Sequence, residues 1–141
     1  MKRTAAAVWT GGLKEGNGKL STGSGTLQQT PYSFSARFEN GAGTNPEELI
    51  AAAHAGCFAM ACSAQLGGAN ITPASIEAAA EVSLEKLDAG WTITASHLRV
   101  TVKAPGADRS ACEKAANAAK ANCPVSRLLN AEVSMELTVE V

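Results

Sequence analysis

The chain has 141 residues, 12 Lys and Arg against 13 Asp and Glu, and a formal net charge of -1. This length is enough to bury a core without disulfides or a structural metal, and a chain without a basic stripe is a poor candidate for binding nucleic acid. Apolar residues make up 45% but aromatic residues only 4%, because alanine dominates the apolar share. Small side chains let backbones approach closely, so we expect tightly packed helices and a core shared between subunits.

The first nine residues resemble a signal peptide, but the apolar stretch ends at Thr10-Gly11-Gly12 and is too short for one. No apolar run approaches the length of a membrane span. We therefore expect a cytoplasmic protein, in which thiols stay reduced. Its four cysteines are then free, catalytic or metal-binding rather than bridged.

The whole chain, residues 1–141, is interpreted as a single domain whose first part holds three short strand-like runs at 4–10, 19–21 and 32–38. In the last run aromatic residues alternate with polar ones, which is typical of a half-buried strand. That alternation predicts a strand with Arg37 on the face opposite the aromatic side chains.

A helix is predicted over 45–66. Asn45 is a suitable cap, Pro46 suits the first position, and Glu47 and Glu48 complement the positive end of the helix dipole. We expect Gly67 and Gly68 to end it. The helix is apolar all round, which is typical of a buried helix that a small domain shares with a partner. Its predicted apolar stripe consists of Leu49, Ala53, Cys57, Met60 and Ala64.

Two long alternating strands are predicted at 76–85 and 91–103, joined by a turn at 88–90. The apolar positions of the second strand change phase, which predicts a bulge near Ser96-His97. Ser110 and Glu113 form a capping box that opens a second helix ending near Asn122.

A short turn over 124–129 and a final alternating strand over 133–141 complete the chain. The predicted element order is βββ-α-ββ-α-β. That order favours an α+β fold rather than a parallel βαβ fold.

Two cysteines stand out from their surroundings. Cys57 is most simply an inert buried thiol, but its neighbours are small, and Arg37, Glu47 and His54 could tune a thiolate. Cys123 precedes Pro124, where its thiol could cap a short helix with an exposed backbone.

Cys62 and Cys112 are more consistent with core packing than with reactive thiols. His54 is best explained as a packed, hydrogen-bonded side chain. It lies three residues before Cys57, so a metal protein that uses His54 and the cysteines is a rival interpretation.

Four segments together resemble the OsmC/Ohr family of osmotically inducible and organic hydroperoxide resistance proteins. The similarity extends over essentially the whole chain, and the position of Arg37 resembles the OsmC branch. The segments are Arg-Phe-Glu at 37–39, Gly-Thr-Asn-Pro-Glu-Glu-Leu-Ile at 43–50, Ala-Ala-His-Ala-Gly-Cys-Phe at 52–58 and Asn-Cys-Pro-Val-Ser at 122–126.

The resemblance implies a thiol-dependent peroxidase for organic hydroperoxides, and more weakly for hydrogen peroxide, in oxidative and osmotic stress defence. By that resemblance Cys57 is the peroxidatic cysteine and Cys123 the resolving one, with which it forms a disulfide. Arg37 stabilises the thiolate and the peroxide, and Glu47 orients Arg37.

The resemblance also implies an OsmC-like fold in an intertwined homodimer, with two central helices wrapped by β-sheets. It implies no cofactor or metal, only an external dithiol reductant. Phe58 and Met60 are the expected apolar lining around Cys57. The alternative is a non-enzymatic dimeric protein that binds an apolar small ligand at its helix interface.

Overall fold

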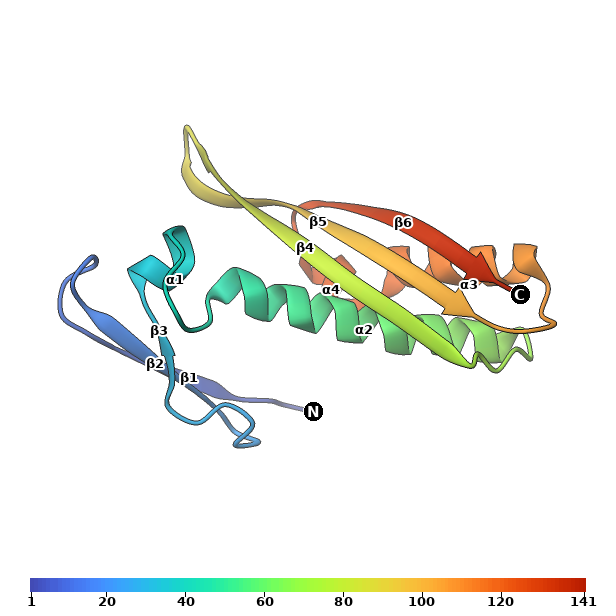
Figure 1. The fold of residues 1–141 in the computed structure, drawn as a ribbon, viewed down its shortest axis with the longest axis horizontal. Helices are drawn as coiled ribbons and strands as arrows, with labels where there is room; N and C mark the ends of the chain where they lie inside the picture. The colour runs from blue at the N-terminus through green and yellow to red at the C-terminus, as the bar shows by residue number, and fades with distance from the viewer. The chain divides into compact units, whose positions relative to one another are not determined.

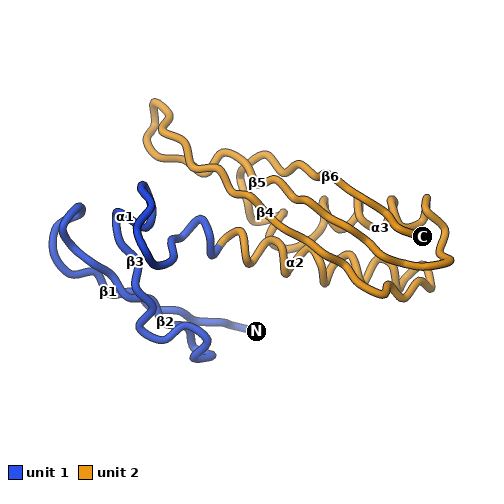
Figure 2. The backbone as a smooth tube through the Cα atoms, viewed as in Figure 1, with its two compact units in different colours: residues 1–49 blue, residues 50–141 orange.

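A computed structural model describes all residues, 1–141, as six strands and four helices. The chain forms two compact units, residues 1–49 and residues 50–141 (Figure 2). The α+β class is confirmed, and the element order departs from the prediction by two additional short helices.

The first unit contains a three-stranded antiparallel sheet in the order β1-β2-β3. Its strands are β1 (Ala5–Thr10), β2 (Asn17–Thr22) and β3 (Thr30–Tyr32). The first two strands agree with the predicted runs. The rings of Trp9 and Tyr32 lie 5.5 Å apart between their centroids, and Gly18, which pairs with Tyr32 across β2 and β3, leaves the space the rings need.

The predicted strand over 32–38 is wrong, because this segment folds into helix α1 (Phe34–Phe38). The Ser33 hydroxyl accepts a hydrogen bond from the Ala36 backbone N–H at 3.1 Å and caps the helix. Phe34 and Phe38 are four residues apart and stack with centroids 4.9 Å apart. Aromatic residues at alternate positions fit the two-residue period of a strand, and those four apart also fit the 3.6-residue period of a helix. The Ser33 cap favours the helix.

Helix α2 (Pro46–Gly68) begins where the sequence predicts. The Asn45 side chain accepts from the Glu48 backbone N–H at 2.8 Å, as expected of a cap. The predicted end is early, since Gly67 and Gly68 belong to the helix. The chain leaves the helix at Asn70, whose φ of 58° is left-handed, while the Ile71 N–H bonds back to the Leu66 carbonyl.

The buried face of α2 is not the predicted apolar stripe. His54, Phe58, Cys62 and Leu66, each four residues from the next, are fully buried, whereas Met60 is 78% exposed. Only 22% of the apolar stretch of α2 is buried. By length and composition α2 is also apolar enough to cross a membrane, so the expectation that no run approaches that length is wrong.

The second unit contains a sheet in the order β4-β5-β6 (Figure 1). Its strands are β4 (Ser75–Leu87), β5 (Gly90–Lys103) and β6 (Glu132–Glu140). β4 and β5 are antiparallel, and the register shifts between Ser83 and Leu84, opposite Thr94. The bulge therefore precedes the predicted position at Ser96-His97.

β5 and β6 pair in parallel. The fold therefore contains one parallel βαβ unit, although the predicted element order favoured an α+β fold without one. Helices α3 (Arg109–Asn122) and α4 (Pro124–Leu128) form the crossover. The predicted cap at Ser110 is also wrong. The Asp108 carboxylate accepts from the Ala111 N–H at 2.8 Å and begins α3 two residues earlier.

The core of the second unit lies between this sheet and helices α2 and α3, which run along one face of it (Figure 1). Apolar side chains of the three elements pack against one another there. They include Phe58 and Leu66 from α2, Leu98, Val100 and Val102 from β5, and Ala115, Ala116 and Ala119 from α3. This core holds the middle of α2 beside the junction of α3 and α4.

Candidate functional site

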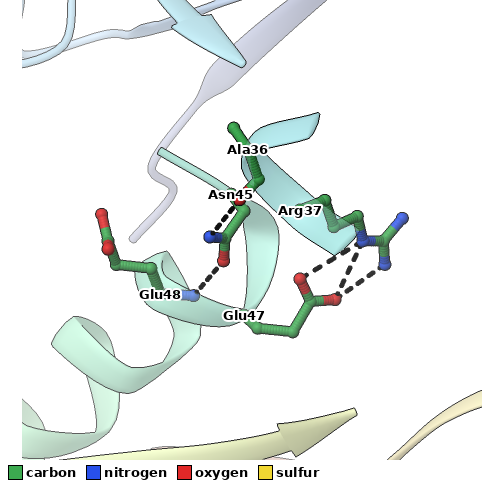
Figure 3. A network of polar contacts seen from close by, with 5 residues as sticks. All are labelled: Ala36, Arg37, Asn45, Glu47 and Glu48. Atoms are coloured by element: carbon green, nitrogen blue, oxygen red, sulfur yellow. Dashed lines mark hydrogen bonds and ion pairs between the residues drawn. The ribbon is translucent and has the colours of Figure 1, made fainter. Parts of the chain in front are cut away.

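Arg37 and Glu47 form a close ion pair in the first unit (Figure 3). Arg37 Nη2 donates to Glu47 Oε1 at 2.7 Å, and Arg37 Nε lies 3.2 Å from both carboxylate oxygens. Glu47 is buried, while the Arg37 side chain is 37% exposed. A forked contact of this kind fixes the plane of the guanidinium and leaves its outer nitrogen available.

Asn45 connects helix α1 to the start of α2. It therefore holds Arg37, on α1, close to Glu47, on α2. The Asn45 amide donates to the Ala36 carbonyl at 3.0 Å while its oxygen caps α2 (Figure 3). Arg37 also lies over the Phe38 ring, with Cζ 5.3 Å from the ring centroid. The guanidinium is thus positioned from two sides.

A cavity of about 230 Å³ opens beside this guanidinium. The sequence does not predict this cavity. The strand predicted over 32–38 would place Arg37 on the face opposite the aromatic side chains, whereas helix α1 brings them together. Its lining is mainly aromatic and apolar, with one cation. The lining includes Trp9, Leu13, Tyr32, Phe34, Arg37 and Phe38.

Cys57 and Cys123 lie together in the second unit. Cys57 is half-buried in the middle of α2, and Cys123 is fully buried between α3 and α4. Burial raises the pKa of the Cys57 thiol, a hydrogen bond from the Val125 backbone lowers it, and the hydrogen-bonded thiol of Cys123 raises it.

Cys123 caps helix α4 as predicted, because its sulfur accepts from the Ser126 backbone N–H at 3.3 Å. The expected exposure is wrong, since packing of α3 and α4 leaves the residue 0% exposed. Its sulfur is enclosed with Cys57 Sγ nearby rather than open to solvent.

His54 is fully buried and hydrogen-bonded, as predicted. Its Nδ1 lies 2.7 Å from Ser96 Oγ on β5, and its Nε2 lies 2.8 Å from Ser126 Oγ on α4. No sequence pattern indicates either serine as a partner of His54. In Cys123-Pro-Val-Ser126, Ser126 is three residues after the cap, at position N3 of the short helix. That spacing is the sequence signal that could have placed Ser126 beside Cys123.

Cys62 and Cys112 are buried in the core, as expected. Burial, and then the neighbouring Cys112, raise the pKa of Cys62 to about 11. Burial and the Asp108 carboxylate raise the pKa of Cys112. Both sulfurs are therefore held as thiols at neutral pH.

The four predicted site residues fall into two pairs, Arg37 with Glu47 and Cys57 with Cys123. The expected apolar lining of Cys57 is not found at the predicted positions, since Phe58 belongs to the core and Met60 is exposed. The rival metal interpretation gains no support, because no three His, Cys, Asp or Glu side chains converge in a way that could hold an ion.

Comparison with known proteins places the chain in a family. The OsmC-like protein family matches residues 39–138. Peroxiredoxin OsmC of Escherichia coli K12 is 52% identical over 130 residues, covering 92% of this chain and 91% of that protein.

Solved structures give the same result. The crystal structure of the organic hydroperoxide resistance protein OhrB of Bacillus subtilis has a TM-score of 0.71 and 29% identity, covering 97% of this chain and 98% of that one. An organic hydroperoxide resistance protein OsmC of Legionella pneumophila has a TM-score of 0.71 and 26% identity, covering 98% and 97%. The match over most of the chain shows that this protein belongs to the OsmC-like family.

Proposed function

We propose that this protein is a thiol-dependent peroxidase that reduces organic hydroperoxides, and hydrogen peroxide more weakly, in defence against oxidative and osmotic stress. The observation that carries the proposal is the contact of two thiols from distant parts of the chain, Cys57 and Cys123. The names of the relatives, a peroxiredoxin and organic hydroperoxide resistance proteins, support it.

In the proposed reaction the Cys57 thiolate attacks the terminal oxygen of the hydroperoxide. The O–O bond breaks, the alkoxide leaves and takes a proton to become the alcohol, and Cys57 becomes a sulfenic acid. Cys123 then attacks Cys57 Sγ, so that the S–S bond forms and water leaves. An external dithiol restores both thiols by disulfide exchange, and no other cofactor takes part.

Arg37 is proposed to supply the positive charge that this chemistry needs. Burial raises the pKa of Cys57, so a stable thiolate requires a cation. The Arg37 guanidinium, whose plane Glu47 fixes, is the group proposed for that role. The aromatic cavity beside Arg37 suits the organic part of an uncharged hydroperoxide.

The active form is proposed to be a cytoplasmic homodimer. Helix α2 is apolar but mostly unburied within one chain, and such a surface needs a partner in water. A second copy that packs its α2 against this one would cover both, in keeping with the expected pair of central helices.

The test is a thiol map of the reduced protein after one equivalent of cumene hydroperoxide, read by alkylation and mass spectrometry. The expected product is one Cys57–Cys123 disulfide, with Cys62 and Cys112 still reduced. Arg37→Lys keeps the charge but loses the forked contact, and should slow Cys57 oxidation by about tenfold or more.

Two results would overturn the proposal. One is a Cys57 that stays reduced, or that pairs with a cysteine other than Cys123. The other is full turnover by a Cys57→Ser variant, which would favour the non-enzymatic binding protein. Cys112→Ser is the matched control, because it also replaces one free thiol by a hydroxyl but leaves the Cys57–Cys123 pair intact.

A further inference from the structure

A continuous chain of hydrogen bonds extends from the sheet to the sulfur of Cys123. Ser96 on β5 contacts Nδ1 of His54, and Nε2 of His54 contacts Ser126 on α4. Ser126 Oγ then lies 3.2 Å from Cys123 Sγ. Each of these three side chains comes from a different element of the second unit: Ser96 from β5, His54 from α2 and Ser126 from α4.

The imidazole in this chain is neutral, so one of its ring nitrogens is free to take up a proton. Burial lowers the pKa of His54, with no charged group contributing to the shift, so the ring is neutral at pH 7. Each ring nitrogen contacts a hydroxyl, and a hydroxyl can either donate or accept. The ring can therefore gain a proton at Nε2 while Nδ1–H remains bonded to Ser96.

Cys123 needs such a path because it has no access to solvent. Its side chain is 0% exposed, so water cannot take its proton directly when it becomes a nucleophile. Ser126 touches the sulfur through both its backbone N–H and its hydroxyl. The hydroxyl is the one of the two groups that can pass a proton onward.

We infer that His54, acting through Ser126, accepts the proton of Cys123 when Cys123 attacks the sulfenic acid of Cys57. The inference rests on the proposed function, since it concerns the resolving step of that reaction. His54 is a positioning and proton-accepting residue that acts through another side chain. It does not touch the peroxide.

The Cys123 proton passes to Ser126 Oγ while the Ser126 proton passes to His54 Nε2. Cys123 Sγ attacks Cys57 Sγ, the S–S bond forms, and the S–O bond of the sulfenic acid breaks. The departing hydroxide takes up the proton that His54 returns through Ser126. The net change converts one sulfenic acid and one thiol into a disulfide and water.

Three substitutions separate proton transfer from simple packing. Ser126→Ala removes the relaying hydroxyl but keeps the backbone N–H on Cys123. His54→Gln keeps a donor and an acceptor but cannot take up a proton. Ser134→Ala is the matched control, because it removes a His–Ser contact of 2.7 Å at His97, in the same sheet and away from the cysteines.

The experiment is a single turnover with cumene hydroperoxide, stopped at intervals with acid. Dimedone-type trapping measures the Cys57 sulfenic acid, and mass spectrometry measures the Cys57–Cys123 disulfide. In Ser126→Ala and His54→Gln we expect sulfenic acid formation within about twofold of wild type and disulfide formation slower by roughly tenfold or more.

The same two variants should accumulate Cys57 sulfinic acid, because the sulfenic acid persists. Ser126→Thr should restore the disulfide rate, and Ser134→Ala should leave both rates unchanged. The wild-type disulfide step should show a solvent deuterium isotope effect that His54→Gln loses. A purely structural role would not produce that difference.

Disulfide formation at the wild-type rate in His54→Gln overturns the inference, and so does an equal slowing of both steps. These results differ from failure of the proposed function. In that case the wild-type protein itself forms no sulfenic acid at Cys57. Circular dichroism melting of each variant establishes that the rates belong to folded protein.

Discussion

Cys57 and Cys62 are five residues apart on helix α2, yet their thiols have different surroundings. Cys57 is half-buried, and the Cys123 thiol and the Val125 backbone beside it influence its pKa. Cys62 points into the core among apolar side chains, with Cys112 as its neighbour. The sequence shows that both cysteines lie on one helix. It does not show which of them faces the sheet, and that difference sets the surroundings of each thiol.

The buried thiol of Cys62 should make stability depend on pH in the alkaline range. Its pKa is raised from 9.0 to about 11. An unfolded chain therefore loses this proton at lower pH than the folded chain does. Stability from this group is complete below pH 9 and is lost as the pH rises from 9 to 11, by at most about 3 kcal/mol.

Thermal melting between pH 8 and pH 11 measures this loss against a Cys62→Ala variant. The variant is less stable at every pH because it loses a packed side chain, but its melting temperature should fall less steeply above pH 9. All other titrating groups are common to both proteins. Parallel curves for the two proteins would show that Cys62 titrates normally.

At the scale of elements, local signals predicted most of the secondary structure and failed where two periods coincide. The caps and alternating runs placed α2 and the strands of the second sheet correctly. The segment at 32–38 failed because aromatics at alternate positions also bring Phe34 and Phe38 together in a helix. That single error concealed the cavity beside Arg37, which requires the helix.

Pairing between elements was beyond local signals. The parallel contact of β5 with β6 depends on how α3 and α4 return the chain, and the polar–apolar alternation within either strand does not specify it. The hydrogen-bonded chain from Ser96 to Cys123 depends on the same packing. His54 was correctly predicted to be packed and bonded, but its partners belong to elements distant in sequence.

The position of the α3 cap is testable by two neighbouring substitutions. Asp108→Ala removes the side chain that accepts from the Ala111 N–H, and should cost about 1 kcal/mol of unfolding free energy. Ser110→Ala changes an exposed residue inside the first turn and should stay within about 0.5 kcal/mol of wild type. Urea denaturation of both variants measures the difference. A larger loss in Ser110→Ala would return the cap to the capping box predicted from the sequence.

At the scale of the whole molecule, the main feature is the apolar surface of α2 that stays exposed in a single chain. The predicted stripe of Leu49, Ala53, Cys57, Met60 and Ala64 is largely outside the core, although its residues are apolar. The helix was therefore correctly identified as apolar all round, but burial within its own chain accounts for only one side. This is the physical basis for proposing a homodimer through α2.

Met60 provides the test, because it is 78% exposed in the middle of that surface. Burying a methionine in an interface contributes roughly 1.5–3 kcal/mol, and a glutamate in its place would have to be desolvated in each of two copies. Met60→Glu should therefore raise the dimer dissociation constant by about a hundredfold or more, as measured by sedimentation equilibrium. Met60→Leu preserves size and polarity and should leave the constant within about tenfold of wild type. A Met60→Glu protein that stays dimeric at nanomolar concentration would show that the copies associate through another surface.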